Sequence, residues 1–401
     1  MSCDESLVLS SKGRHYQYNR TSFNDLSKLS HLLMQRYPFS NKCFIVPSGM
    51  SAICVAIQSI LRAHQSQKIT QPINLIYGDE LYCDTPKTIT YLASGHDQIH
   101  RYTIDITQTE SILKLFKSLR NSPDDTTGHF NILFIESCTN PSGFIMDFSI
   151  LPQLRQLSSQ LVVIVDNTWL TDLIFNPFQY DVDVVVTSLT KYYSAGSAIA
   201  GAIVSRSQFD WYFEEHIKRN GLHVSPHNIG IIIENLSSME QRLRQSSHTT
   251  IKVLQQLQSM LKISTIIHPA MDTHPSHQLA LQYFQHGLWP SVFTMVIPVS
   301  KETALHAMES SSMIEHKTSF GGRLSRTDPW PHEVNGTTIC RIAIGYDDTE
   351  TNVVMGLTDL IETMIPSPSV ARPKLVIKRK IQLSEEPNPI LLHDQVESSQ
   401  K

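Results

Sequence analysis

The stretch that decides the fold is residues 161–192, which holds two apolar runs that each end in polar residues. The first reads Leu-Val-Val-Ile-Val-Asp-Asn-Thr at 161–168, and the second ends Ser-Leu-Thr-Lys-Tyr at 188–192. Short runs rich in β-branched residues are typical of buried parallel strands. We therefore expect Asp166 and Lys191 at the carboxyl ends of such strands, where α/β proteins bind their ligands.

Similar runs recur on both sides of this stretch and alternate with helix-like segments from about residue 41 to residue 235. Such alternation predicts an α/β fold with a mainly parallel central sheet that helices cover. The expected strands are 74–77, 132–135, 161–165, 183–189 and 198–205.

The pattern changes beyond Pro226, where 228–258 reads as one long helix and 292–299 and 339–344 read as strands of a smaller α+β C-terminal domain. Four segments are predicted: an N-terminal arm, a large domain, a small domain and a disordered tail that is poor in apolar residues. Their expected bounds are 1–40, 41–235, 236–365 and 366–401.

An aspartate and a lysine at neighbouring strand ends suit pyridoxal phosphate. The lysine amine can form a Schiff base with the aldehyde of this cofactor, and the acid can keep the pyridine nitrogen protonated, which makes the ring an electron sink. For two isolated charges, an ordinary strand-end salt bridge would be the simpler interpretation. The residues that flank the two charges favour the cofactor.

The flanking sequences resemble Val-Asp-Asn-Thr and Ser-Ala-Thr-Lys-Tyr of the Cys/Met metabolism family of pyridoxal phosphate enzymes, the transsulfuration enzymes. Further matches follow in family order from Tyr18 to about Asp347. Within this family the chain is most similar to the cystathionine γ-lyases and γ-synthases. The resemblance implies fold type I of the pyridoxal phosphate-dependent transferases, which is aspartate aminotransferase-like, with Lys191 as the cofactor lysine and Asp166 as the partner of the ring nitrogen.

The small residues Ser-Gly-Met-Ser at 48–51 precede a run of helix formers. Their free amides would lie at a helix N-terminus, where the helix dipole favours phosphate, although a simple helix cap explains the same pattern. The family holds the cofactor phosphate at this position, so the resemblance makes Gly49 and Met50 cofactor-binding residues. It adds the hydroxyls of Ser188 and Thr190 to the same phosphate site.

The sequence Tyr-Asn-Arg-Thr at 18–21 matches the family's Tyr-x-Arg-Thr, in which the tyrosine and the arginine reach the cofactor phosphate of a neighbouring subunit. A planar guanidinium pairs phosphate oxygens two at a time, which suits Arg20 to this task. Without the rest of the pattern, a solvated polar arm would explain Tyr18 and Arg20. The resemblance implies a homodimer with shared active sites, and a tetramer built from two dimers.

Tyr82 aligns with the family tyrosine that stacks on the pyridine ring. Its ring would hold the cofactor flat, and its hydroxyl could assist proton transfer, so Tyr82 joins Lys191 as a predicted catalytic residue. A core tyrosine is the alternative. The family continues Tyr-Gly-Gly or Tyr-Gly-Cys, whereas this chain has Cys83 and Asp84, a departure that bears on substrate choice.

Three residues match substrate positions of the family: Asn140, Ser319 and Arg341. There they clamp the α-carboxylate of the amino acid, for which a bidentate arginine is the expected anchor. A turn residue and a surface strand charge are the simpler interpretations of Asn140 and Arg341. Thr318 stands where many γ-lyases and γ-synthases have glutamate and β-lyases have tyrosine, and residues 323–330 depart from the commoner continuation.

In the chemistry that the resemblance implies, the freed Lys191 amine takes the Cα proton of an amino acid and then a Cβ proton, so that the group on Cγ leaves. Water then gives elimination, and a thiol gives replacement. The sequence thus predicts a transsulfuration enzyme that acts on cystathionine or an activated homoserine, as a carbon–sulfur lyase or a transferase. Cystathionine β-lyase, methionine γ-lyase, O-acylhomoserine sulfhydrylase and a non-catalytic homologue are the alternatives. Cys83 lies one position early for the cysteine of methionine γ-lyases, and the retained Lys191 argues against a non-catalytic chain.

The composition fits a protein that binds small molecules. The 401 residues carry a net charge of −4, without the basic excess that is typical of nucleic-acid binding. The six cysteines are scattered and form no zinc-site spacing, which predicts no metal and fits a reducing cytosol. No apolar run approaches the roughly 20 residues of a membrane span, and no targeting signal is evident, so a cytoplasmic location is expected.

Overall fold

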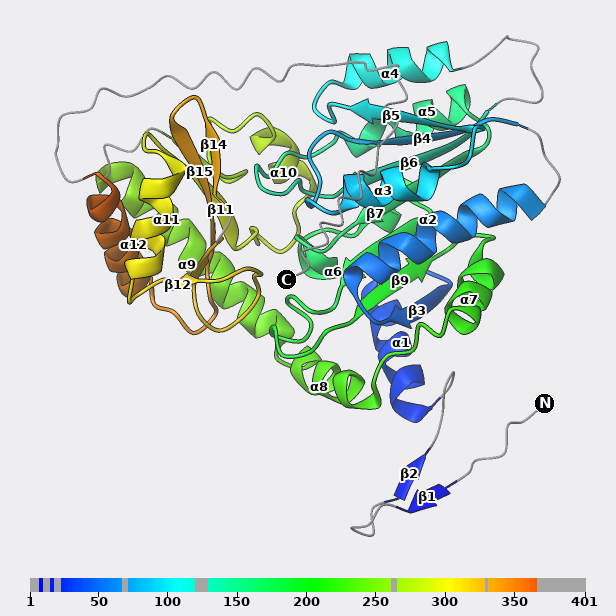
Figure 1. Ribbon diagram of the computed structural model, residues 1–401, viewed down its shortest axis with the longest axis horizontal. Coiled ribbons are helices and arrows are strands. Elements are labelled where there is room, and N and C mark those ends of the chain that lie inside the picture. Colours follow the sequence, from blue (N-terminus) through cyan, green and yellow to red (C-terminus); the bar gives the residue numbers. More distant parts are fainter. Residues whose placement is uncertain are drawn as a thin grey trace, which may run out of the picture.

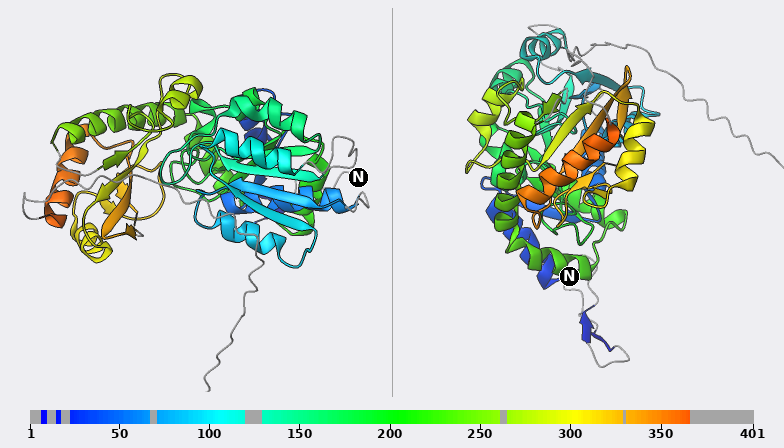
Figure 2. Two further views of the ribbon diagram at one scale, coloured as in Figure 1. Left: turned by 90° about the horizontal axis from the view of Figure 1, so that it is seen from above. Right: turned by 90° about the vertical axis from the view of Figure 1, so that its left-hand side faces the viewer.

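The computed structural model describes residues 7–9, 15–17, 23–66, 71–119, 129–260, 265–328 and 331–365. These residues form two lobes, one around a seven-stranded sheet and one around a six-stranded sheet (Figure 1). The left view of Figure 2 shows the two lobes side by side; the long helix α9 (Met239–Met260) starts in the core of the large lobe and continues into the core of the small lobe. An antiparallel ribbon of β1 (Leu7–Leu9) and β2 (His15–Gln17) precedes them.

The sheet of the large lobe is mainly parallel, as predicted. Its strand β9 runs antiparallel to both neighbours, while the other strands are parallel to one another. In spatial order the strands are β3 (Lys42–Val46), β9 (Gly201–Ser205), β8 (Val184–Ser188), β7 (Leu161–Asp166), β6 (Phe130–Glu136), β4 (Ile73–Gly78) and β5 (Ile99–Ile104).

Helices cover both faces of this sheet because its strands are apolar on both sides. In β6, Leu133 and Ile135 pack into the core on one face, and Ile132 and Phe134 pack into the core on the other. The first face is covered by α1 (Asn24–Arg36), α4 (Thr109–Ser118), α5 (Leu151–Leu157), α6 (Thr171–Ile174), α8 (Pro226–Leu236) and the 3₁₀ turns Phe148–Ile150 and Pro177–Tyr180. The second face is covered by α2 (Gly49–Ser66), α3 (Thr85–Ala93) and α7 (Asp210–Arg219).

The small lobe has its own sheet and its own core, as expected for an α+β unit. Its strands are β10 (Thr265–Ile267), β11 (Val292–Ile297), β15 (Thr337–Ala343), β13 (Arg326–Thr327) and β12 (Glu315–His316), with β14 (His332–Val334) also paired to β15. Helices α9, α11 (Lys301–Ser310) and α12 (Glu350–Met364) bury their apolar sides against it. The short helix α10 (His277–Tyr283) packs instead into the core of the large lobe.

The prediction of one long helix at 228–258 is wrong, because the chain breaks between α8 and α9. At the break, Ser237 Oγ donates to Glu234 O at 2.9 Å, and Ser238 Oγ donates to Asn235 O at 3.2 Å. Serine side chains that bond to nearby carbonyls compete with helical hydrogen bonds. The break lies next to the predicted domain boundary at 235, which itself stays a prediction.

Three sequence predictions fall partly or wholly outside the described residues: the arm at 1–40, its phosphate-binding pair Tyr18 and Arg20, and the tail at 366–401. Within the residues that are described, no helix is both long enough and apolar enough to cross a membrane.

Candidate active site

The site forms where the carboxyl ends of β6, β7 and β8 meet the small lobe. Glu136 and Asp166 are register partners at the ends of β6 and β7. Asp166 Oδ1 accepts a hydrogen bond from Thr168 N at 2.9 Å, and Thr168 Oγ1 accepts one from Ser188 N at the same distance. Burial raises the pKa of Asp166, while the hydrogen bonds from Thr168 and the charge of Lys191 act in the opposite direction.

Lys191 follows β8 and reaches the small lobe. Its Nζ donates to Ser319 Oγ at 2.8 Å and lies 5.1 Å from the centre of the Phe320 ring. Burial and the nearby Arg341 and Arg326 charges lower the pKa of Lys191 to about 8. Part of the amine is therefore unprotonated near neutral pH, the form that a nucleophile or general base needs.

The salt bridge that would explain Asp166 and Lys191 as a purely structural pair is not found among the described residues, because the lysine bonds to Ser319 instead. Close packing makes this contact possible. Gly321, at φ +77°, lies so near that an added Cβ would be 2.8 Å from Tyr192 N. A residue with a side chain here would push the Ser319 loop away from Lys191.

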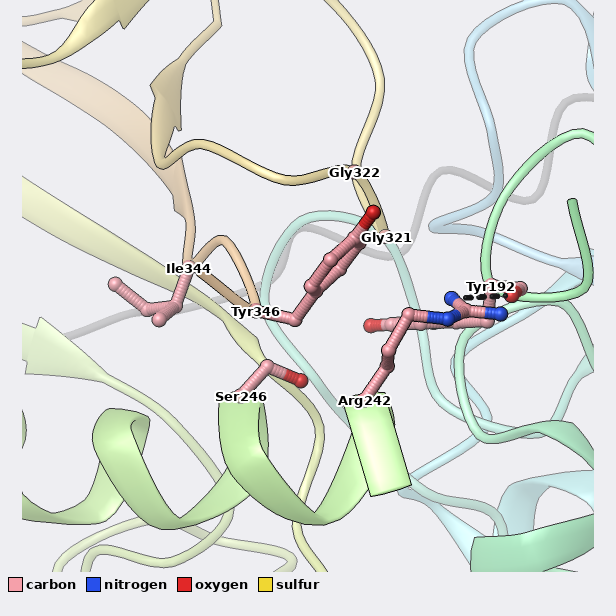
Figure 3. A pocket seen from close by; sticks show the side chains of 7 residues that line it. All are labelled: Tyr192, Arg242, Ser246, Gly321, Gly322, Ile344 and Tyr346. Carbon is pink, nitrogen blue, oxygen red and sulfur yellow. Dashed lines mark hydrogen bonds between the residues drawn. The ribbon is translucent and has the colours of Figure 1, made fainter. Parts of the chain in front are cut away.

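Behind this loop lies a small hollow between the lobes, lined by Tyr192, Arg242, Ser246, Gly321, Gly322, Ile344 and Tyr346 (Figure 3). The side chain of Arg242 points in among the other lining residues. Arg242 Nη1 donates to Tyr192 O at 2.9 Å, and its charge lies 5.2 Å from the centre of the Tyr346 ring. These contacts of Arg242 hold Tyr192, the residue next to Lys191, in place. The hollow leaves little room for a ligand.

The predicted substrate residues Asn140 and Arg341 are in direct contact, although 201 positions separate them in the chain. Arg341 Nη1 donates to Asn140 Oδ1 at 3.0 Å, and Arg341 Nη2 lies 2.5 Å from Asp328 Oδ2. The arginine that the sequence identified as a carboxylate anchor therefore already holds one carboxylate, which belongs to a residue of its own lobe.

Tyr82 and Asn140 are held by one buried side chain, Glu136. Its Oε1 accepts from Tyr82 N at 2.5 Å, and its Oε2 accepts from Asn140 N at 3.1 Å. Burial, followed by the Asp166 charge, raises the pKa of Glu136 well above its usual range. Burial also raises the pKa of Tyr82, although this residue is 39% exposed.

The N-terminus of α2 has the open geometry that a phosphate group requires. Among the described residues the amides of Gly49 and Met50 have no acceptor, and a Cβ on Gly49 would lie 2.8 Å from Ser188 Cβ and 3.2 Å from its Oγ. Two amides and one hydroxyl thus converge at a glycine whose missing side chain leaves space, so these residues fit the phosphate of the expected cofactor. The Thr190 hydroxyl is already engaged, since it donates to Ala200 O at 3.2 Å.

Comparison with known proteins settles the family. A model of the Cys/Met metabolism PLP-dependent enzymes matches residues 2–330 of this chain. The chain belongs to this family. The predicted dependence on pyridoxal phosphate and the predicted fold are thereby confirmed.

Curated relatives are similar at low identity. An L-alanine/L-glutamate racemase of Wolbachia pipientis wMel is 24% identical over 77% of this chain and 70% of its own length. A cystathionine β-lyase of Neurospora crassa is 26% identical over 67% of the chain and 55% of its own length. An L-methionine γ-lyase of Fusobacterium nucleatum subsp. polymorphum is 24% identical over 76% and 66%. The match to the last two thus spans about half to two thirds of their length.

Solved structures share the fold. A cystathionine γ-synthase from Xanthomonas oryzae pv. oryzae in complex with cystathionine aligns with a TM-score of 0.73 over 90% of this chain and 92% of that chain, at 20% identity. An O-acetylhomoserine (thiol)-lyase described as putative, from Campylobacter jejuni and carrying a pyridoxyl-lysine group, aligns with a TM-score of 0.71 over 87% and 88%.

The structure brings together the predicted residues at the described positions, while Tyr18 and Arg20 lie outside them. Sequence reasoning missed Glu136 and Asp328. Glu136 ends an apolar strand, as Asp166 does, and the same rule would have identified it. Asp328 had no such signal, because its contact with Arg341 depends on the pairing of two strands of the small lobe. No group of three potential metal-binding side chains occurs within the described ranges.

Proposed function

We propose that this chain is a carbon–sulfur lyase or transferase of amino-acid metabolism, acting on cystathionine or an activated homoserine. The observation that carries the proposal is the arrangement where the two lobes meet: the Lys191 amine bonds to Ser319, and Arg341, whose charge lowers the pKa of that amine, bonds to Asn140. A general base beside a carboxylate anchor is what removal of a proton from an α-amino acid requires.

The cofactor would be held at both of its ends. Gly49 and Met50 amides with the Ser188 hydroxyl would bind the phosphate, Asp166 would pair with the ring nitrogen, and Tyr82 would cover the ring. Thr190 would contribute to the phosphate site only if its hydroxyl left Ala200. When bound through Lys191, pyridoxal phosphate supplies an electron sink that stabilises negative charge at the substrate Cα.

The side chains would then act in sequence on the amino acid. Arg341, Asn140 and Ser319 would orient its α-carboxylate, and the Lys191 amine would take the proton from Cα. After giving up that first proton, the same amine would remove a proton from Cβ. The thiolate of cystathionine or the carboxylate of an acylated homoserine would then leave from Cγ. Lys191 is half-buried, which would limit the access of water to its amine while the amine acts on the two carbons.

The assembly and location follow from the family resemblance. We propose a homodimer in which Tyr18 and Arg20 of each subunit contact the cofactor phosphate of the other, with two dimers forming a tetramer in the cytoplasm. The predicted arm at 1–40, the domains at 41–235 and 236–365 and the tail at 366–401 are part of this proposal.

The proposal is tested by incubating the purified protein and pyridoxal phosphate with L-cystathionine, O-succinyl-L-homoserine plus a thiol, L-methionine and L-alanine, followed by product analysis. Cysteine with 2-oxobutyrate, or a new thioether from the activated homoserine, is the expected result. Homocysteine with pyruvate would indicate β-cleavage. Interconversion of alanine enantiomers without release of a thiol would overturn carbon–sulfur chemistry and favour a racemase.

A further inference from the structure

Asp328 occupies the anchor at which a substrate carboxylate is expected. It lies at the end of β13, which pairs with β15 so that Thr327 is opposite Ile342. One residue further along, Asp328 N donates to Arg341 O at 3.0 Å. The two residues are thus opposite each other on paired strands, where side chains on one face meet.

Their side chains form a close ion pair. Arg341 Nη2 is 2.5 Å from Asp328 Oδ2, and the arginine and aspartate side chains are only 13% and 17% exposed. The other terminal nitrogen of Arg341 donates to Asn140 Oδ1 at 3.0 Å. Both terminal nitrogens of the guanidinium therefore have acceptors before any substrate arrives.

An incoming α-carboxylate meets this arrangement with two costs. It must share or take a nitrogen that Asp328 already uses, and it must approach a carboxylate of the same charge in a partly desolvated place. If Arg341 is available for only a fraction of the time, the apparent affinity for the substrate carboxylate falls to that fraction of its intrinsic value. The cost arises from the carboxylate alone and does not depend on the side chain of the substrate.

We propose that Asp328 is a specificity-determining residue that competes with the substrate carboxylate for Arg341. The inference rests on the proposed function, since it takes Arg341 as the anchor of an α-amino acid. Asp328 weakens the binding of every ligand that carries an α-carboxylate by a similar factor. It leaves the binding of the corresponding amines, which lack the carboxylate, unchanged.

The test compares two probes that engage the cofactor without turnover of a carbon–sulfur bond: an α-methyl amino acid, such as α-methyl-L-methionine, and the matching amine without a carboxylate, 3-(methylthio)propylamine. Dissociation constants are measured from the absorbance change of bound pyridoxal phosphate, in the wild type and in Asp328→Asn. Asparagine keeps the shape of aspartate and can still accept from Arg341, but it lacks the charge.

We expect Asp328→Asn to bind the α-methyl amino acid on the order of tenfold more tightly and the amine with unchanged affinity. Asp328→Glu, which keeps the charge, should show no such gain. Asp347→Asn is the matched control, because Asp347 Oδ2 accepts from Arg323 Nε at 2.7 Å in an exposed ion pair of the same lobe. That control should bind both probes like the wild type.

The wild type provides a second measurement that needs no variant. With the anchor engaged, it should bind the α-methyl amino acid and the amine within roughly tenfold of each other, whereas an available arginine would favour the amino acid by on the order of a hundredfold or more. A hundredfold preference in the wild type, or equal changes for both probes in Asp328→Asn, overturns the role of Asp328 and leaves the proposed function intact. If neither the wild type nor Asp328→Asn binds the α-methyl amino acid, the role of Asp328 and the proposed function are both overturned.

Discussion

The two lobes differ in how closely their site residues resemble the family pattern. On the large lobe, Asp166, Ser188 and Lys191 stand at or just after strand ends, in sequences that resemble the family motifs closely. On the small lobe, Ser319 and Arg341 match, but the residues between them depart, and Asp328 pairs with the arginine. We propose that the large lobe holds the cofactor, while the small lobe sets how tightly the carboxylate of an amino acid is bound.

Removal of Lys191 tests the large lobe directly and should have the largest effect. Lys191→Ala should reduce turnover by about 10⁴-fold or more, since the base and the cofactor attachment are lost together. Steady-state rates with the substrate found for the wild type would measure this. The control is Lys42→Ala, a lysine in an exposed pair with Glu214; residual turnover in Lys191→Ala within tenfold of that control would contradict the assignment.

Arg341→Ala should have the next largest effect and should act mainly on the substrate. Loss of a buried charged partner costs about 2–5 kcal/mol, so KM for an amino acid should rise by at least about 30-fold. The affinity for pyridoxal phosphate should change much less, because on that side Arg341 acts only through the pKa of Lys191; titration of the apoprotein would measure it. Arg323→Ala, at an exposed ion pair of the same lobe, serves as the control. A drop in cofactor affinity as large as the rise in KM would abolish the proposed division between the lobes.

Gly49→Ala should weaken cofactor binding by roughly tenfold, because the new Cβ would lie 2.8 Å from Ser188 Cβ and narrow the space at the amides of α2. Fluorescence titration of apoprotein with pyridoxal phosphate would give the dissociation constant. Gly230→Ala in α8 is the matched control, since a Cβ there has nothing within 4 Å. If both variants bind the cofactor like the wild type, the phosphate does not lie at the start of α2.

The smallest expected effect is a shift in pH dependence. The rate at which apoprotein captures pyridoxal phosphate should rise with pH through about 8, because the uncharged Lys191 amine is the reactive form and its pKa is lowered to that value. Arg326 contributes to the lowering, so Arg326→Ala should move the midpoint to higher pH. Stopped-flow absorbance over a pH series would show this, and a midpoint that moves to lower pH would refute the electrostatic explanation.

Much of the large lobe was predictable because its signals are local. A run such as Leu-Val-Val-Ile-Val followed by Asp166 indicates both a buried strand and the edge at which it ends. Strands β3 and β5 were not predicted: both lie at edges of the sheet, and β5 has a mixed burial pattern. The break between α8 and α9 was also missed, since two serines do not rule out a helix by themselves.

The small-lobe half of the site was less predictable because it depends on contacts between distant residues. Arg341 bonds to Asn140 of the large lobe and to Asp328 on a paired strand of its own lobe. Neither contact leaves a periodic pattern in the sequence. Glu136 is an intermediate case. Its position at a strand end could be read from the sequence, but its bonds to the amides of Tyr82 and Asn140 could not.

The most direct test of the central claim is to locate the cofactor on the chain. Protein incubated with pyridoxal phosphate is reduced with borohydride, digested and analysed by mass spectrometry, with the visible spectrum recorded before reduction. The account predicts a visible band that borohydride removes and a phosphopyridoxyl group on Lys191. A label on another lysine, or no label at all, would contradict the claim that the large lobe binds the cofactor through Lys191.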